Sequence, residues 1–168
     1  MIERVMRAVK LDVDFYRETH DDDTLTGEAF ILVAIIGAVS GALGGSISDD
    51  GSFVGGLIGG VIGAPIGLVI GGGILFLLGR LFKGSAQYLG LVRNLAYASA
   101  PGILSWIPFI GWLASIWSFV CVVVAVRESH KVSTGAAVVV VLIPTAIVFF
   151  LFFVLALLGL ALLAGLAS

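Results

Sequence analysis

Four long stretches of this chain carry no charged residue, and they constrain its fold more than any other feature. They cover residues 29–48, 51–79, 94–126 and 132–168, which are 20, 29, 33 and 37 residues long. A helix needs roughly 20 apolar residues to cross a hydrocarbon core of about 30 Å. A helix formed by such a stretch has no polar face to expose to water, so its surroundings must be the bilayer. The sequence therefore predicts an all-α, polytopic transmembrane helical bundle.

Length and composition limit the domain organisation and the class of partner. The chain has 168 residues, of which 60% are hydrophobic, and a mean hydropathy of +1.17. We expect a cytoplasmic amphipathic helix and acidic linker over residues 1–27, followed by one transmembrane helical domain over residues 28–168. Outside the ends of the expected spans the sequence has no cluster of Lys and Arg, which argues against nucleic-acid binding.

The first 18 residues have the pattern of an amphipathic helix. Apolar residues recur at spacings of three and four, on one helical stripe: Ile2, Val5, Met6, Val9, Val13 and Tyr16. This helix either rests on the membrane, with Arg4, Arg7, Lys10 and Tyr16 at the interface, or packs as a lid on the cytoplasmic end of the bundle. The run His20-Asp21-Asp22-Asp23 is interpreted as a solvated linker, because it lacks the ligand spacing of a metal site.

Glycine recurs at every fourth position in the first two expected spans, about residues 29–48 and 53–79. Small residues at this spacing let two helices approach closely. The predicted helix-packing residues are Gly37, Gly41 and Gly45 in the first span and Gly55, Gly59, Gly63, Gly67 and Gly71 in the second, with Gly56 and Gly60 one position over. The turn signal Asp49-Asp50-Gly51 predicts a tight antiparallel hairpin. Alternatively, the second glycine ladder and Pro65 line a pore or flex as a gate.

The two remaining uncharged stretches are too long for one straight crossing each. The 33 residues of 94–126 would form a helix of about 50 Å. Pro101 and Pro108 interrupt this stretch, so we predict two short spans or a helical hairpin with its turn near Pro108 and Gly111. In the last stretch, Ser133-Thr134 is expected to cap a helix that bends at Pro144.

The distribution of positive charge favours five spans. In a five-span arrangement every Lys and Arg lies on one side of the membrane, which the positive-inside rule makes cytoplasmic. The N-terminus is then cytoplasmic and the C-terminus lies on the opposite side of the membrane. If the chain is prokaryotic, that membrane is the plasma or inner membrane. A four-span arrangement, with residues 94–126 as one bent crossing, would place Arg127 and Lys131 outside.

The sequence offers no residues for a chemical site. No ionisable residue lies well inside an expected span, where such residues mark ion, proton or substrate pathways. No Ser/His/Asp set, facing carboxylate pair or Cys/His metal spacing is present, and His130 is interpreted as a solvated loop histidine. We therefore predict no catalytic, cofactor-binding or metal-binding residue, and a protein that is not an enzyme.

Arg93, Tyr97 and Pro101 follow one another at spacings of four in the third expected span. Together with the Leu11–Glu18 segment and its Phe15-Tyr16 pair, this string resembles the Yip family, the Ypt/Rab-interacting membrane proteins, in a short prokaryotic form. The resemblance covers about residues 4–165. It implies a five-span helical bundle with a cytoplasmic N-terminus.

Eukaryotic members of the Yip family act as adaptors in vesicle trafficking and membrane shaping, with small GTPases and each other as partners. This chain lacks their long N-terminal domain and their Asp-Leu-Tyr-Gly-Pro motif, so the resemblance does not extend small-GTPase binding to it. We expect a membrane scaffold, adaptor or accessory subunit that contacts membrane lipid and other membrane proteins or further copies of itself. The alternative is a channel or carrier for a small or neutral solute, which the glycine ladder and the proline-interrupted helices suggest.

Overall fold

The computed structural model describes the backbone of residues 1–47 and 52–166, with side chains as far as Leu160. Throughout this part the chain is helical and forms no strand. Four of the described helices are long and apolar enough to cross a membrane, over Asp23–Ile47, Phe53–Leu81, Ile110–His130 and Thr134–Leu160. The chain is therefore an all-helical, multi-pass membrane protein. The third of the five expected spans corresponds to α5 (Tyr88–Ala98), whose 11 residues extend only about 16 Å.

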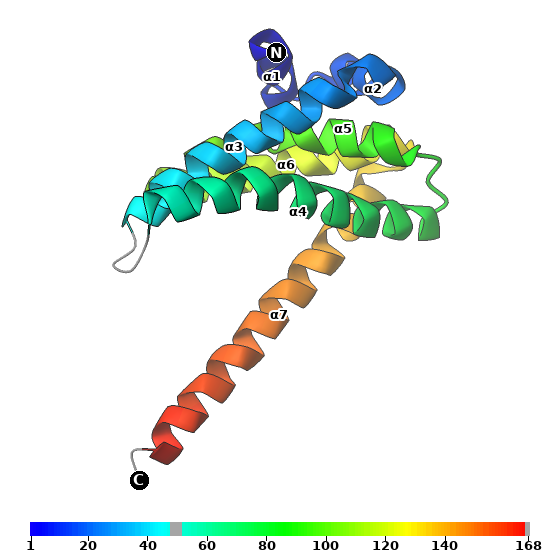
Figure 1. The fold of residues 1–168 in the computed structure, drawn as a ribbon. Helices are drawn as coiled ribbons and strands as arrows, with labels where there is room; N and C mark the ends of the chain where they lie inside the picture. The colour runs from blue at the N-terminus through cyan, green and yellow to red at the C-terminus, as the bar shows by residue number, and fades with distance from the viewer. Residues whose placement is uncertain (48–51, 167–168) are drawn as a thin grey trace.

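The N-terminal segment forms two short helices, so the prediction of one helix over residues 1–18 was wrong. α1 (Ile2–Val9) ends before Leu11, whose φ of 61° no right-handed helix accommodates. α2 (Val13–Asp21) begins immediately afterwards, because the Asp12 side chain accepts a hydrogen bond of 3.1 Å from the backbone N–H of Phe15. Both helices pack on the bundle, which is the lid arrangement, above α3, α5 and α6 (Figure 1).

After the 3-10 turn η1 (Asp23–Leu25), α3 (Thr26–Ile47) and α4 (Phe53–Leu81) lie side by side and form the most extensive helix pair of the fold (Figure 1). Ser52 starts α4 by accepting a hydrogen bond of 3.3 Å from the backbone N–H of Gly55. The predicted turn at Asp49-Asp50-Gly51 lies outside the described residues. The glycine-rich hairpin is present, but its contact face on α4 differs from the predicted one.

On α4 the helix contact uses glycines one position away from the predicted ladder. A Cβ at Gly60 would lie 2.5 Å from the Gly37 carbonyl carbon, and one at Gly56 would lie 2.8 Å from that of Gly41. On α3, Gly45 faces the backbone of Ser52. The predicted glycines of α4 do not touch α3: a Cβ would meet nothing within 4 Å at Gly59, Gly63, Gly67 or Gly71, and only the Ser52 side chain at Gly55. Both rows have four-residue spacing, so periodicity could not distinguish them.

Residues 88–130 fold back on themselves as the predicted helical hairpin. α5 is followed by η2 (Ala100–Leu104), a turn in which Phe109 has a φ of 65°, and α6 (Ile110–His130). Every residue of α5 from Gly90 to Ala98 is buried. α5 therefore lies inside the protein, between the N-terminal helices and the longer helices α3, α4 and α6.

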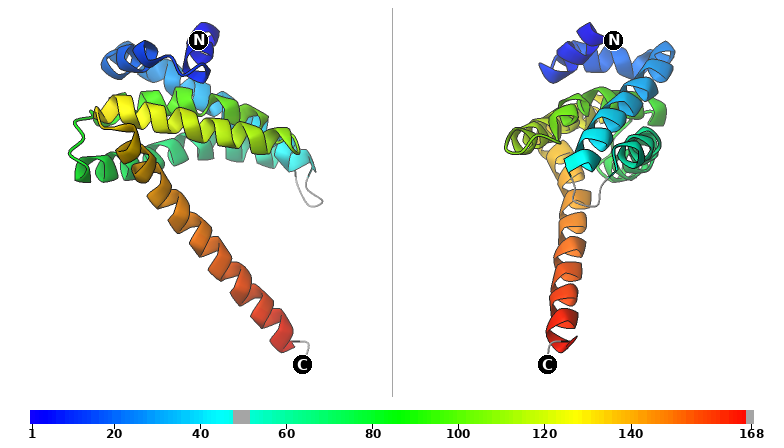
Figure 2. Two further views of the ribbon diagram at one scale, coloured as in Figure 1. Left: turned by 180° about the vertical axis from the view of Figure 1, so that it is seen from behind. Right: turned by 60° about the vertical axis from the view of Figure 1, so that its left-hand side comes forward.

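The last helix, α7 (Thr134–Leu166), leaves the bundle at a steep angle, as Figure 2 shows from two sides. Ser133 caps it, as predicted, by accepting a hydrogen bond of 3.3 Å from the N–H of Ala136. The helix continues through Pro144 without a break. Only its first turns are buried, at Ala137, Val140 and Val141, and most of the described side chains beyond Thr145 are exposed and apolar.

Candidate functional site

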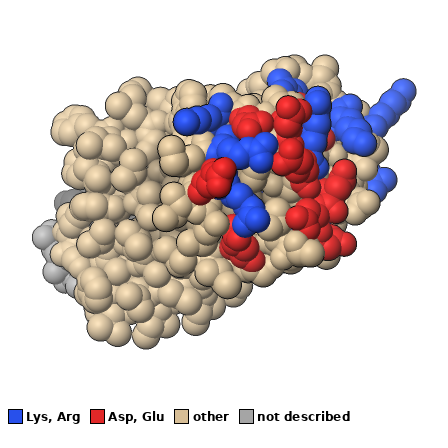
Figure 3. Space-filling view, turned by 90° about the horizontal axis from the view of Figure 1, so that it is seen from above, with Lys and Arg blue, Asp and Glu red and all other residues tan. Residues whose placement is uncertain are grey.

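Charged side chains gather on one part of the surface, while the rest of that face carries none (Figure 3). They belong to α1, α2 and the adjoining ends of the longer helices. Two adjacent features lie here. The Arg93 network is the set of hydrogen bonds that Arg93 makes with α2, η1 and α3. The Arg127 pocket is a cavity between α2, the end of α6 and the start of α7.

Arg93, on α5, is 1% exposed and binds three neighbouring elements at once. Its Nε donates to the Thr19 carbonyl at 3.0 Å, and its Nη2 donates to the His20 carbonyl at 2.5 Å. Its Nη1 donates to Asp23 Oδ1 at 2.7 Å and to Thr26 Oγ1 at 3.0 Å. The last carbonyls of a helix have no partner within the helix and carry a partial negative charge. Arg93 therefore caps α2 and fixes it to the start of α3.

Tyr97, one helical turn after Arg93, contacts the same junction of α2 and α3. Its hydroxyl donates a hydrogen bond of 2.9 Å to Glu28 Oε1, at the start of α3. The other Glu28 oxygen, Oε2, accepts from Arg4 Nη1 at 2.6 Å, and the N-terminal amine lies 3.4 Å from Oε1. Phe15 stacks edge-on against the Tyr97 ring, with centroids 5.2 Å apart. Glu28 thus ties α1, α3 and α5 together.

His20 belongs to this packed junction, so its interpretation as part of a solvated linker was wrong. It is 7% exposed. Its Nε2 accepts a hydrogen bond of 3.2 Å from the backbone N–H of Gln87. Because an N–H can only donate, Nδ1 carries the ring proton and donates it to Asp21 at 2.8 Å. This hydrogen bond lowers the pKa of the Asp21 carboxyl below its usual value.

Some of the residues expected at the membrane interface bind other protein groups, and one of them is exposed. Arg4 pairs with Glu28, and Arg7 donates to Asp12 at 2.7 Å and to Glu18 at 2.9 Å. The Arg7 hydrogen bond lowers the pKa of Asp12. Lys10 is exposed.

Tyr16, expected at the membrane surface, is fully buried in the protein instead, and its hydroxyl donates to the Ala8 carbonyl at 3.1 Å. Asn94 holds the same segment, since its Nδ2 donates to the Tyr16 carbonyl at 2.8 Å and to Ser129 Oγ at 2.9 Å. α2 is thereby tied to α5 and α6 by polar contacts as well as by its apolar face.

His130, interpreted from the sequence as solvated, is 1% exposed at the end of α6. Its imidazole fills a notch between Gly79 and Gly84, where a Cβ at Gly79 would lie 2.6 Å from the ring Cδ2. Its ring centroid is 6.1 Å from that of Phe76. The notch explains why glycine occupies both positions. His130 acts here as a packing residue that joins α6 to α4.

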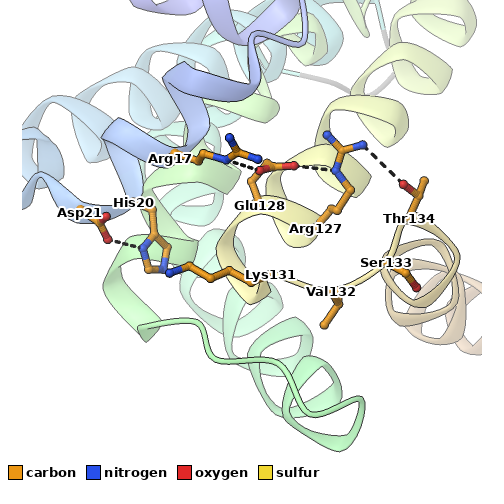
Figure 4. Close-up of a pocket in the computed structure, with 9 residues that line it drawn as sticks. All are labelled: Arg17, His20, Asp21, Arg127, Glu128, Lys131, Val132, Ser133 and Thr134. Atoms are coloured by element: carbon orange, nitrogen blue, oxygen red, sulfur yellow. Dashed lines mark hydrogen bonds and ion pairs between the residues drawn. The ribbon is translucent and has the colours of Figure 1, made fainter.

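The Arg127 pocket has a volume of about 650 Å³. Figure 4 shows its nine lining residues: Arg17, His20, Asp21, Arg127, Glu128, Lys131, Val132, Ser133 and Thr134. Glu128, whose side chain is 8% exposed, is held by Arg17 Nε at 2.8 Å and by Arg127 Nε at 2.7 Å. The lining therefore contains three cationic and two anionic side chains.

Within the described residues, no group of three or more His, Cys, Asp or Glu side chains converges as a metal site would require. The buried polar groups of the Arg93 network bond to one another, which fixes the fold.

A family model for the Yip1 domain matches residues 12–167. This chain belongs to the Yip1 domain family. No curated protein and no solved structure gives a significant match. Members of the Yip family are membrane proteins associated with trafficking and are not known as enzymes. The residues of the Arg93 network lie within the matched part of the chain.

Within this Yip1 domain, Arg93 and Tyr97 lie on one face of α5 and bind the junction of α2 and α3 together, whereas Pro101 is buried in η2 beside α1. Sequence reasoning missed Glu28, which is the partner of Tyr97, and it also missed Asn94 and Glu128, which bind α2 through Tyr16 and Arg17. Glu28 gave one signal, because it is the single acidic residue in the first turn of a long apolar helix. Asn94 and Glu128 gave no such signal, because Asn94 bonds to Tyr16 and Ser129 and Glu128 bonds to Arg17, which all lie far away in the sequence.

Proposed function

We propose that this Yip1 domain protein is a non-enzymatic integral membrane scaffold, adaptor or accessory subunit, linked to membrane organisation or trafficking. In this proposal, residues 1–27 form a cytoplasmic cap on the transmembrane domain of residues 28–168. The charged face of α1 and α2 is the surface that a partner protein contacts. The N-terminus is cytoplasmic and the C-terminus lies across the membrane, with α5 and η2 as a short fifth crossing.

One observation carries this proposal. The buried polar side chains of the cap are used to hold α1 and α2 in place, and the exposed charges lie on top of this rigid base. Glu18, for example, has a 63% exposed side chain although it is oriented by Arg7. A preorganised charged surface favours protein recognition, because little side-chain conformational freedom must be lost on binding.

The test is purification of the tagged, natively expressed protein in nanodiscs or mild detergent, with quantitative mass spectrometry of what stays bound. The proposal predicts a partner at fixed stoichiometry. A matched Glu18→Lys variant, which reverses one exposed charge of the cap, should lose part of that partner. Recovery of the protein alone, or only with further copies of itself, would contradict an adaptor role.

A second candidate, a channel or carrier for a small or neutral solute, is favoured by two apolar cavities. Their volumes are about 470 Å³ and 310 Å³, and both are lined by Ser115, Ser118 and Val122. The Ser118 hydroxyl is buried without a hydrogen-bond partner among the described residues. Solute flux into proteoliposomes should then fall in Ser118→Leu and persist in Gly63→Leu, whose side chain would point into open space. Absence of flux for every solute tested would count against this candidate.

A further inference from the structure

We propose that the Arg127 pocket binds the phosphate-bearing headgroup of an anionic phospholipid. This inference does not depend on the adaptor role, because a headgroup can occupy the pocket whether or not a protein contacts the rest of the charged face of α1 and α2. The pocket is lined by three cations, Arg17, Arg127 and Lys131, and by two carboxylates, Asp21 and Glu128. With His20 neutral, one net positive charge remains inside a cavity of about 650 Å³.

Protein contacts position the two arginines, Arg17 and Arg127, but occupy only some of their hydrogen-bond donors. Both hold Glu128 through Nε, at 2.8 Å and 2.7 Å. A guanidinium has five N–H donors in a planar fork, so most of its terminal donors remain for a ligand. Arg127 Nη1 makes only a long contact of 3.4 Å with Thr134 Oγ1, and Arg17 Nη1 lies 3.8 Å from Asp14. This fork matches the oxygens of a phosphate group.

Lys131 adds a further positive charge to the lining of the pocket. It follows the last residue of α6, has a φ of 55°, and makes no ion pair within the described part of the chain. Like His20, it lines the pocket (Figure 4). Thr134 begins α7, and the N-terminus of a 33-residue helix adds a partial positive charge to the same cavity. Thus one ligand phosphate would meet three independent sources of positive potential.

The position of the pocket indicates a lipid rather than a soluble phosphate. The pocket lies at the connection between α6 and α7, and both helices are long and apolar enough to cross a membrane. Such a connection lies at the membrane boundary, where basic pockets between helices bind anionic headgroups. α7 leaves the pocket with apolar side chains such as Val139 and Leu142 exposed, at 42% and 45%. Acyl chains can pack along this helix.

The test is native mass spectrometry of the full-length protein in detergent, titrated with dioleoylphosphatidylglycerol or dioleoylphosphatidylcholine. We expect preferential binding of phosphatidylglycerol. Lys131→Gln should weaken it about fivefold, and Arg127→Gln with Lys131→Gln about 25-fold, from the typical contribution of one cation near an anionic membrane surface. Lys131→Gln removes no hydrogen bond or ion pair described in the structure, so its melting temperature should equal that of the wild type.

Lys83→Gln is the matched control. Lys83 is also exposed, follows the end of a spanning helix and has a φ of 62°, but it does not line the pocket. It should change phosphatidylglycerol binding less than twofold. Equal binding of the two lipids, or equal losses in Lys83→Gln and Lys131→Gln, would overturn the proposal. Displacement of phosphatidylglycerol by millimolar sn-glycerol phosphate would overturn the lipid assignment in favour of a soluble phosphate ligand.

Discussion

Alanine substitutions on two adjacent rows of glycine in α4 should have effects of opposite sign. Gly60 faces α3, where a Cβ would lie 2.5 Å from the Gly37 carbonyl carbon and 3.2 Å from the Ala38 nitrogen. Gly59, its neighbour, would place a Cβ in open space. The two substitutions are chemically identical and adjacent in sequence, so a difference between them reports the helix contact alone.

The magnitude follows from what each Cβ meets. At Gly60 the obstacle is backbone, which cannot rotate away, so overpacking should cost about 3 kcal/mol, the upper part of the usual range. Alanine regains roughly 1 kcal/mol through its higher helix propensity, at either position. The net expectation is a loss of about 2 kcal/mol for Gly60→Ala and a gain of up to about 1 kcal/mol for Gly59→Ala.

The assay is thermal unfolding of the full-length protein in one detergent, followed by the loss of monodisperse protein on size exclusion. At about 2–4 °C per kcal/mol for a chain of this size, Gly60→Ala should lower the melting temperature by roughly 4–8 °C. Gly59→Ala should raise it by about 2–4 °C. Gly41→Ala and Gly63→Ala repeat the comparison on a contact row and on the open row.

The reasoning would be refuted if Gly59→Ala and Gly63→Ala destabilised the protein as much as Gly60→Ala does. That outcome would place the predicted ladder, and not the Gly56 and Gly60 row, against another helix. A change of oligomeric state in Gly59→Ala at unchanged melting temperature would instead show that the open row joins two copies of the chain.

Three further predictions concern the cap and the notch. Gly79→Ala should cost about 1–3 kcal/mol in the wild type but almost nothing in a His130→Ala background, as a double-mutant cycle of unfolding would show. Arg93→Met should destabilise the protein by about 3–5 kcal/mol, measured by unfolding in a mild detergent, because two carbonyls of α2 lose their buried donor. The lowered pKa of Asp12 means that the native state binds fewer protons than the unfolded chain, so the Asp12–Arg7 contact contributes stability at neutral pH. That contribution is lost as the pH falls below about 4, and Arg7→Gln should flatten the acid limb of a melting-temperature profile between pH 7 and 3.

Long apolar stretches were sufficient to predict an all-helical membrane protein, because a long uncharged segment in a bilayer has few stable conformations other than a helix. The α5–α6 hairpin was predictable for a similar reason: 33 uncharged residues with Pro101 and Pro108 exceed one crossing. By contrast, the glycine row of α4 that contacts α3 lies one residue away from the predicted row. This offset corresponds to about 100° around the helix. Two rows with equal spacing cannot be separated without knowing the partner helix.

The cap illustrates a different limit of sequence reasoning. His20 and His130 are polar residues in charged segments, which normally indicates solvent exposure. Both are buried because distant segments close over them: Gln87 binds His20, and Gly79 and Gly84 enclose His130. Tyr16 is buried because Leu11 turns the chain, and a left-handed residue leaves no trace in hydrophobic periodicity.

The most direct test of the account is site-specific photo-cross-linking in native membranes, with the cross-linker at Lys10 or Glu18 of the cap and, as a control, at Phe149 or Phe152 of α7. All four side chains are exposed, and the two phenylalanines are on the helix that extends away from the bundle. The account predicts one discrete protein adduct from the cap positions and none of comparable yield from α7. Adducts from α7 alone, with no adduct from either cap position, would contradict it.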